Sequence, residues 1–279
     1  MILTRAPIAL ASLILGLTSS AAWAGDSVCW IQNGVLLAPA VAAGVNGVFI
    51  LDTGAAQSQI DATQASEADI ADAAVTGEVR LAGRVFPGVS MQVLELDART
   101  RAFPTPIAGV LGSDVLARQV VEISTNPCRL RLARSAHARG VRPGIVLPVE
   151  LRGGAPYVSA GVSDGTKSRI GAFRIDTGSP FSVTLEAAQG AASGGRLRAL
   201  SIGGALFETI PAGPAQDASD GALGAIGEPI WARFARMRLD YARRTLTLAH
   251  PLPAKSGERV SASARRPARW CGSWRRARR

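Results

Sequence analysis

The sequence has few of the side chains on which common hydrolytic sites depend. Its 279 residues include three cysteines and two histidines, His137 and His250. Catalytic zinc is usually held by histidine, cysteine and carboxylate ligands at characteristic spacings, and no such spacing is present here. The sequence therefore disfavours metal-dependent hydrolysis and predicts no metal site, with both histidines on the surface. No cysteine–histidine pairing or phosphate-binding loop stands out either.

Aromatic residues and long apolar runs are also scarce. Aromatics make up 5% of the chain, so Val, Leu, Ile and Ala must fill the core, which an apolar content of 47% allows. No segment beyond the first 24 residues is long and apolar enough to span a membrane. A chain of this length holds one large domain or two of ordinary size.

The first 24 residues have the pattern of a secretory signal. Arg5 provides a positive start, and residues 8–17 form an apolar core that is short for a membrane span. Ala22-Trp23-Ala24 offers small residues at the cleavage positions. The pattern predicts a mature protein that starts near Gly25 and is periplasmic or secreted. The alternative is a retained membrane anchor.

The cysteines are consistent with export. Cys29 and Cys128 flank the first half of the chain, and an oxidising compartment would let them form a disulfide. Such a bridge closes a loop of about 100 residues and contributes ~4–5 kcal/mol in the chain-entropy model. The alternative is a pair of buried free thiols. Cys271 has no evident partner.

The net positive charge of the chain comes almost entirely from its C-terminal tail. Residues 255–279 carry nine basic and one acidic residue, out of a net charge of +10 for the chain. After Arg5 is also removed, residues 25–254 keep about +1, which excludes a basic, nucleic-acid-binding surface. The tail is expected to be disordered. Trp270 and Trp274 lie among its arginines, so weak contact with an anionic membrane surface is the alternative to a merely solvated tail.

Two halves of the chain can be superimposed as a long internal repeat. Asp52-Thr53-Gly54 matches Asp176-Thr177-Gly178 at an offset of 124 residues, and Val110-Leu111-Gly112 matches Ala225-Ile226-Gly227 at an offset of 115. A period this long indicates duplicated domains rather than a solenoid. We expect a signal at 1–24, lobes at 25–139 and 140–254, and a tail at 255–279.

The local pattern is mostly β. Asn-Gly, Asp-Gly and Gly-Gly pairs accept positive φ and predict hairpin turns. The predicted turns are at Val45-Asn46-Gly47, Gly83-Arg84, Gly153-Gly154, Ser163-Asp164-Gly165 and Gly203-Gly204. Residues 62–74 are rich in Ala, Glu and Asp and predict a helix.

The duplicated Asp-Thr-Gly motifs carry the chemistry. Each follows an apolar, strand-like run, so the duplication would bring Asp52 and Asp176 together at a pseudo-twofold axis. Two neighbouring carboxylates cannot both ionise cheaply, so they share one proton and provide a general base beside a general acid. A plain strand-to-turn junction explains one copy alone, but two copies in register favour catalysis.

The motifs resemble those of the aspartic proteases, in which an Asp-Thr-Gly loop is followed by an apolar-apolar-Gly strand that crosses beneath it. The Asp-to-Gly distances, 60 and 51 residues, resemble compact retroviral-type lobes, and bacterial retropepsin-like proteins are the nearest match. The resemblance covers about residues 30–250. It implies an all-β fold of two related β-barrel lobes with a cleft between them.

By this resemblance, Asp52 and Asp176 are the catalytic pair, with Thr53 and Thr177 hydrogen-bonded across the lobe interface. Active-site support is assigned to Thr53, Gly54, Thr177, Gly178, Ser179, Leu111, Gly112, Ile226 and Gly227. Ser179 is expected to donate to Asp176, which would make Asp176 the more readily ionised acid. The pepsin-type flap tyrosine has no match, and the flap candidates are Thr76-Gly77 and Ser193-Gly194-Gly195.

The sequence therefore predicts an exported aspartic endopeptidase that acts on a polypeptide substrate. Water is the nucleophile, so no cofactor is needed. Both acids come from one chain, so the protein is expected to be a monomer. The alternative is a catalytically silent peptide-binding or envelope-sensor protein with the same fold.

Overall fold

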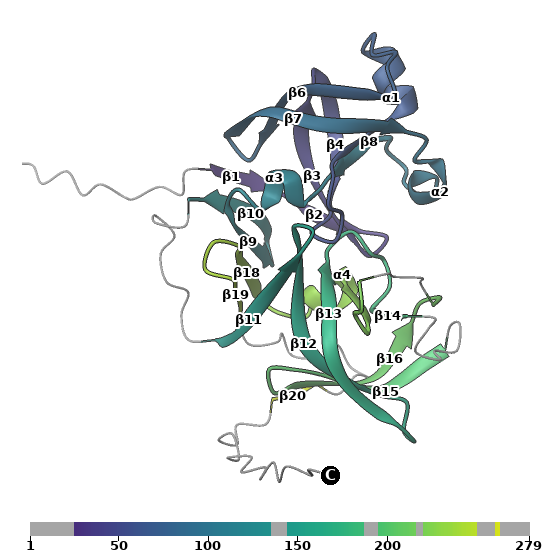
Figure 1. The fold of residues 1–279 in the computed structure, drawn as a ribbon, viewed down its shortest axis with the longest axis vertical. Coiled ribbons are helices and arrows are strands. Elements are labelled where there is room, and N and C mark those ends of the chain that lie inside the picture. Colours follow the sequence, from purple (N-terminus) through teal and green to yellow (C-terminus); the bar gives the residue numbers. More distant parts are fainter. Residues whose placement is uncertain (1–24, 135–143, 187–194, 216–219, 250–259, 263–279) are drawn as a thin grey trace, which may run out of the picture.

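The computed structural model describes residues 25–134, 144–186, 195–215 and 220–249, together with the backbone of residues 260–262. The chain forms an all-β protein with two closed barrels, each of six strands, which confirms the predicted fold class. Figure 1 shows the two barrels one above the other, with a further sheet beside their junction.

The first lobe is built from β2 to β8. Its barrel follows the strand order β3-β4-β8-β5-β7-β6 and closes where β6 returns to β3. The elements are β2 (Trp30–Gln32), β3 (Val35–Ala42), β4 (Val45–Leu51), β5 (Gln59–Asp61), α1 (Ala62–Glu67), β6 (Ala74–Leu81), β7 (Arg84–Leu94), α2 (Asp97–Thr100) and β8 (Ile107–Leu111).

The second lobe repeats this plan. Its barrel has the order β12-β13-β17-β14-β16-β15 and closes where β15 pairs with β12. The elements are β12 (Ala155–Ser163), β13 (Ser168–Asp176), β14 (Val183–Leu185), β15 (Gly195–Ile202), β16 (Ala205–Ala212), β17 (Gly224–Gly227) and α4 (Glu228–Trp231).

The lobes share a sheet with the order β1-β10-β9-β18-β19-β11. Its centre joins β9 to β18 in antiparallel pairing, so each lobe contributes half of the sheet. Its elements, with the helix that leads into β9, are β1 (Gly25–Val28), α3 (Ser113–Leu116), β9 (Val120–Thr125), β10 (Cys128–Ala133), β11 (Ile145–Arg152), β18 (Arg236–Asp240) and β19 (Thr245–Leu248). A Cys29–Cys128 disulfide ties the N-terminal strand into this sheet, as predicted.

In each lobe the strand that leads into the Asp-Thr-Gly loop lies beside the strand that carries the apolar-apolar-Gly sequence. β4 pairs in parallel with β8, and β13 pairs in parallel with β17. Every residue of β8 and β17 is buried, because one face contacts the barrel core and the other faces a second layer of side chains. Burial on both faces explains why the sequences of β8 and β17 are continuously apolar.

Several turn predictions are confirmed, but one is wrong. The pairs at 153–154 and 203–204 have positive φ at hairpin turns, and residues 164–167 join β12 to β13. The turn predicted at Gly83-Arg84 falls one residue earlier, at Ala82-Gly83, because Arg84 already begins β7. Asn46-Gly47 lies inside β4 instead, and the turn falls at Ala43-Gly44. Gly47 is needed there because a Cβ would lie 2.7 Å from the Cβ of Ala108.

The predicted helix at 62–74 is also shorter than expected. Asp61 caps α1 by accepting the N–H groups of Thr63 and Gln64, and the helix ends at Glu67. Asp69 adopts a left-handed conformation with φ 59°, which stops the helix before β6 starts at Ala74.

Four predictions fall on residues outside the described ranges: the signal at 1–24, the boundary between the lobes at 139–140, the surface position of His137 and His250, and most of the tail. Within the tail, β20 (Val260–Ala262) pairs with β16, so these three residues are an exception to the expected disorder. No helix in the described ranges is long and apolar enough to cross a membrane.

Candidate active site

The two aspartates stand at the ends of equivalent strands, where the lobes meet. Asp52 follows β4 and its N–H donates to Leu111 O at 2.9 Å, while Asp176 ends β13 beside Gly227. A Cβ on Gly54 would lie 2.7 Å from the carboxyl carbon of Asp176. Each motif therefore presses its glycine against the acid of the other lobe, which brings the predicted pair together.

The threonines lock the two loops to each other. The Thr53 hydroxyl donates to Ile175 O at 2.6 Å, and the Thr177 hydroxyl donates to Leu51 O at 2.6 Å. Each hydroxyl also accepts the backbone N–H of the other threonine at 3.2 Å. Both side chains are buried, so the hydrogen bonds form away from water.

Backbone N–H groups hold each carboxylate in place. Asp52 Oδ1 accepts from the N–H groups of Gly54 and Ala55 at 2.8 and 2.9 Å. Asp176 Oδ1 accepts from the Gly178 N–H at 3.1 Å. Such donors favour the ionised form, and Asp52 receives two of them where Asp176 receives one.

The remaining predicted support residues lie beneath the loops. A Cβ on Gly112 would lie 2.8 Å from Ala55 O, and one on Gly227 would lie 2.7 Å from Ser179 O. Only glycine permits this close approach of backbones. Leu111 and Ile226, one residue earlier in each strand, are fully buried in the core below. The structure thus gathers all the sequence-predicted site residues around one point.

The surroundings of Asp176 favour its protonated form. Burial, together with the charge of Asp52, raises the pKa of Asp176 to about 7. This direction is opposite to the expected one, in which a hydrogen bond from Ser179 eases the ionisation of Asp176. Among the described residues the Ser179 hydroxyl makes no hydrogen bond to Asp176 and accepts the Phe181 N–H at 3.4 Å, so the expected role of Ser179 is wrong.

Arg99, which the sequence did not single out, contacts the pair directly. It lies on α2, in the segment between β7 and β8. Its Nη2 donates to Asp52 Oδ2 and, at 2.9 Å, to Gly178 O. The segment is anchored by Leu96, whose N–H donates to Asp61, and by Asn33, whose side chain donates to Ala102 O at 3.0 Å. The Arg99 guanidinium therefore binds Oδ2 of Asp52, while the backbone N–H groups bind Oδ1.

Glu228 and Arg174 were also missed. Glu228 begins α4 directly after Gly227, is 1% exposed, and its Oε2 has no hydrogen-bond partner in the described residues. Burial, assisted by the nearby charge of Asp176, raises its pKa well above the usual value, so it is a neutral third carboxyl. Arg174 precedes Asp176 by two residues on β13, with Nε 4.0 Å from Asp176 Oδ2.

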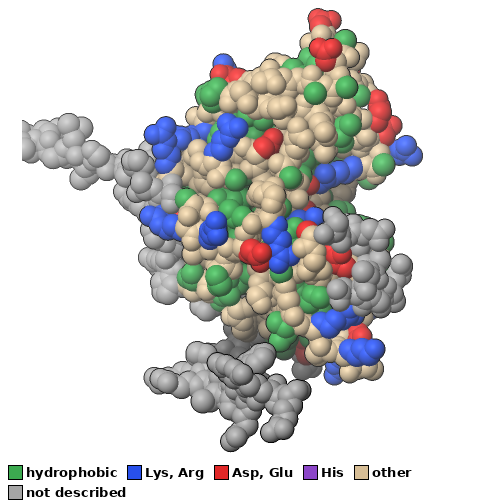
Figure 2. Space-filling model, in the orientation of Figure 1, with side chains coloured by type: hydrophobic (Ala, Val, Ile, Leu, Met, Phe, Trp, Pro, Cys, Tyr) green, Lys and Arg blue, Asp and Glu red, His purple; other side chains and the backbone are tan. Residues whose placement is uncertain are grey.

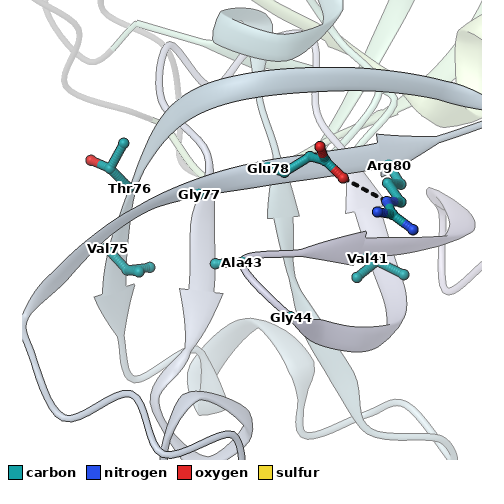
Figure 3. Close-up of a pocket in the computed structure, with 8 residues that line it drawn as sticks. All are labelled: Val41, Ala43, Gly44, Val75, Thr76, Gly77, Glu78 and Arg80. Carbon is teal, nitrogen blue, oxygen red and sulfur yellow. Dashed lines mark hydrogen bonds and ion pairs between the residues drawn. The ribbon is translucent and has the colours of Figure 1, made fainter.

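Neither flap candidate closes over the acids. Thr76 and Gly77 lie inside β6, beside the β3–β4 turn and a depression of about 510 Å³ on the first lobe that the Glu78–Arg80 ion pair borders (Figure 3). The hairpin turns at residues 82–83, against Gly25. Of the second candidate, residues 193–194 are outside the described ranges, and Gly195 begins β15.

Other catalytic patterns find no support in the described part of the chain. No group of three or more His, Cys, Asp and Glu side chains there could hold a metal ion. Residues 161–165 spell Gly-x-Ser-x-Gly, but they form the end of β12 and the following turn, where the Ser163 hydroxyl accepts the Gly165 N–H at 3.2 Å.

Comparison with known proteins supports the fold. No protein-family model matches the chain, and no curated protein is similar to it in sequence. Among solved structures, the aspartic proteinase from Irpex lacteus matches with a TM-score of 0.52 and 15% sequence identity. The match covers 81% of this chain and 97% of that one. The protein therefore has the bilobal, all-β fold of an aspartic proteinase.

Proposed function

We propose that this protein is an aspartic endopeptidase that hydrolyses peptide bonds with a water activated by Asp52 and Asp176. The observation that carries the proposal is the placement of two buried acids side by side, each held by a backbone N–H of its own loop and each in contact with the glycine of the other lobe. Sharing one proton between two carboxyls suits acid–base catalysis by a water nucleophile. The compact lobes favour the retropepsin-like subtype, and the N-terminal pattern favours export.

In the proposed reaction, a water bound between the acids attacks the carbonyl carbon of the substrate. Asp52 accepts a proton from this water as the new C–O bond forms, and Asp176 donates its proton to the carbonyl oxygen. Collapse of the resulting tetrahedral intermediate breaks the C–N bond, and the leaving nitrogen takes a proton from Asp52. As the C–N bond breaks, one hydroxyl of the intermediate returns its proton to Asp176 and becomes the carbonyl oxygen of the product acid, which restores the starting state.

Arg99 must move before this reaction can start. Its Nη2 occupies Asp52 Oδ2, where the water must bind, and it also holds Gly178 O. The Arg99 side chain is 33% exposed, so it has a path to solvent. On this proposal, the contact between Arg99 and Asp52 belongs to a resting state in which the base is capped.

The same contact is the observation in favour of the second candidate, a silent peptide-binding or envelope-sensor protein. A permanently capped Asp52 could not act as a base. The two candidates separate on one variant, because Asp52→Asn abolishes the function of a protease but leaves that of a peptide binder intact.

The direct test is digestion of an unfolded protein across acidic and neutral pH. We expect cleavage that is lost in both Asp52→Asn and Asp176→Asn. A variant that cleaves as well as the wild type would overturn the assignment of that residue.

A further inference from the structure

The two lobes present different side chains beside the acids. In a β-strand, residues two apart point to the same face. Ile50 precedes Asp52 by two residues on β4, and Arg174 precedes Asp176 by two residues on β13. The duplication therefore places an apolar side chain on one side of the catalytic pair and a cation on the other.

On the first lobe, the layer around Ile50 is apolar. Leu37 pairs with Ile50 across β3 and β4, and both are fully buried. Leu96, from the segment that carries Arg99, packs against this layer. The layer behind Asp52 is therefore hydrocarbon, where the second lobe has the cation Arg174.

On the second lobe, the matching layer is polar. Tyr157 stands opposite Arg174, in the place that Leu37 holds opposite Ile50. The Tyr157 hydroxyl donates to Asp220, and the guanidinium of Arg152 lies 4.8 Å from the centre of the tyrosine ring. Aromatic and ionic neighbours thus fix the wall behind Arg174.

Arg174 itself has donor capacity to spare. Its side chain is 25% exposed, and its Nε lies 4.0 Å from Asp176 Oδ2, which is beyond hydrogen-bond distance. No described residue accepts a hydrogen bond from this Nε, although the atom is buried. The nearest acid keeps its proton up to about pH 7, so it neutralises the guanidinium poorly. The Asp220 carboxylate is engaged by the Tyr157 hydroxyl and by the Ala222 N–H at 3.0 Å.

Two guanidinium groups border the catalytic pair. Arg99 is ion-paired with Asp52, whereas Arg174 has no carboxylate within hydrogen-bond distance of its Nε and lies near Asp220, whose pKa it helps to lower. Figure 2 shows Lys and Arg side chains, with Asp and Glu side chains among them, at the waist of the molecule where the lobes meet. A cation that is incompletely neutralised at a binding site attracts negatively charged segments of a substrate.

We propose that Arg174 is a specificity-determining residue, and that the substrate class is polypeptides with an Asp or Glu beside the scissile bond, on the side bound by the second lobe. This inference rests on the proposed function for the position of the substrate. The guanidinium would form a charge-assisted hydrogen bond with the carboxylate of the substrate.

Binding and cleavage test the proposal separately. Binding is measured by fluorescence anisotropy with the full chain carrying Asp176→Asn, which keeps Arg174 and mimics the protonated acid. The probes are two degenerate octapeptide libraries that differ only in Glu or Gln at one fixed central position. Cleavage of the same libraries is measured with the active chain by mass spectrometry.

We expect the Glu library to bind about tenfold more tightly than the Gln library. Arg174→Gln should reduce this ratio to about one, and Arg174→Lys should restore part of it. Arg198→Gln, on the exposed face of β15 in the same lobe, is the matched control and should keep the full ratio. Cleavage sites of the active chain should be enriched in acidic residues on one side.

Each other outcome is decisive. Equal binding of both libraries to the chain with Arg174 intact overturns the proposal, even if Arg174→Gln fails to fold. Cleavage without acidic preference overturns it while the protease function stands. Acid-selective binding that depends on Arg174 but comes without cleavage supports this inference and overturns the proposed protease function. A shifted pH profile in Arg174→Gln with an unchanged Glu-to-Gln ratio assigns Arg174 to tuning Asp176 and overturns specificity.

Discussion

Replacing Thr177 with Val should destabilise the protein through the hydrogen bonds that join its lobes. The Thr177 hydroxyl donates to Leu51 O at 2.6 Å and accepts the Thr53 N–H at 3.2 Å, and the side chain is fully buried. Valine keeps the shape but strands one acceptor and one donor. Each stranded buried group costs about 1–3 kcal/mol, so for the two groups we expect a loss of roughly 2–6 kcal/mol in the free energy of unfolding.

Urea unfolding of the purified variants measures this loss. Thr177→Ser is the matched control, because it keeps the hydroxyl and removes one methyl group, at a cost of about 1 kcal/mol. Thr53→Val should behave like Thr177→Val. The double variant should cost less than the sum of the two, because both residues share one network.

The reasoning is refuted if Thr177→Val stays within about 0.5 kcal/mol of the wild type, which is the ordinary range for surface substitutions. Strict additivity of the two valine variants would also contradict it, since independent sites add and coupled sites do not.

Three further predictions follow from the site and the shared sheet. Replacing Cys29 and Cys128 with serine should lower the free energy of unfolding by ~4–5 kcal/mol, because the bridge closes a 99-residue separation; a loss under about 1 kcal/mol in urea unfolding would argue against the loop-closure account. Because the pKa of Asp176 is raised to about 7 from an ordinary 3.8, activity should fall above neutral pH. The stability that its proton provides should be full below 3.8 and lost as the pH rises through about 7, and Asp176→Asn should remove that part of the pH dependence in urea titrations. Arg99→Gln should raise kcat/KM roughly fivefold by freeing the base, after discounting the partly exposed ion pair to about 1 kcal/mol, and should move the alkaline limb of the pH profile upward; Arg101→Gln on the same segment is the control, and a drop in kcat/KM for Arg99→Gln alone would show that Arg99 assists catalysis.

The sequence was sufficient to predict that Asp52 and Asp176 lie side by side because the motif that carries them is duplicated. Asp52 and Asp176 stand at matching points of a repeat, and each repeat supplies its own crossing strand. Periodicity and motif order are local properties that survive without coordinates. The disulfide could be predicted because its two cysteines, Cys29 and Cys128, flank one lobe of a chain with an export pattern.

Arg99 could not be predicted in this way. It lies in the β7–β8 segment, and it reaches Asp52 only because Asp61 and Asn33 anchor that segment from elsewhere in the lobe. Its partner Gly178 belongs to the other lobe. Such a contact is set by tertiary packing and leaves no pattern in the sequence.

The prediction of a turn at Asn46-Gly47 was wrong for a related reason. The pair has the local preference of a hairpin turn, but Gly47 lies so close to Ala108 on the neighbouring segment that a Cβ would clash there. The glycine therefore permits close packing inside β4 and does not form a turn. Ser179 shows the same limit, because its hydroxyl accepts the N–H of Phe181 instead of donating to Asp176.

The central claim is that Asp52 and Asp176 together hydrolyse peptide bonds. The most direct measurement is digestion of an unfolded protein by the full chain and by Asp52→Asn and Asp176→Asn, from acidic to neutral pH, with and without a statine-type mimic of the transition state. The account predicts cleavage by the wild type that the mimic blocks and that both variants lose while still folded. Cleavage that persists in either folded variant, or no cleavage by the wild type at any pH, would contradict it.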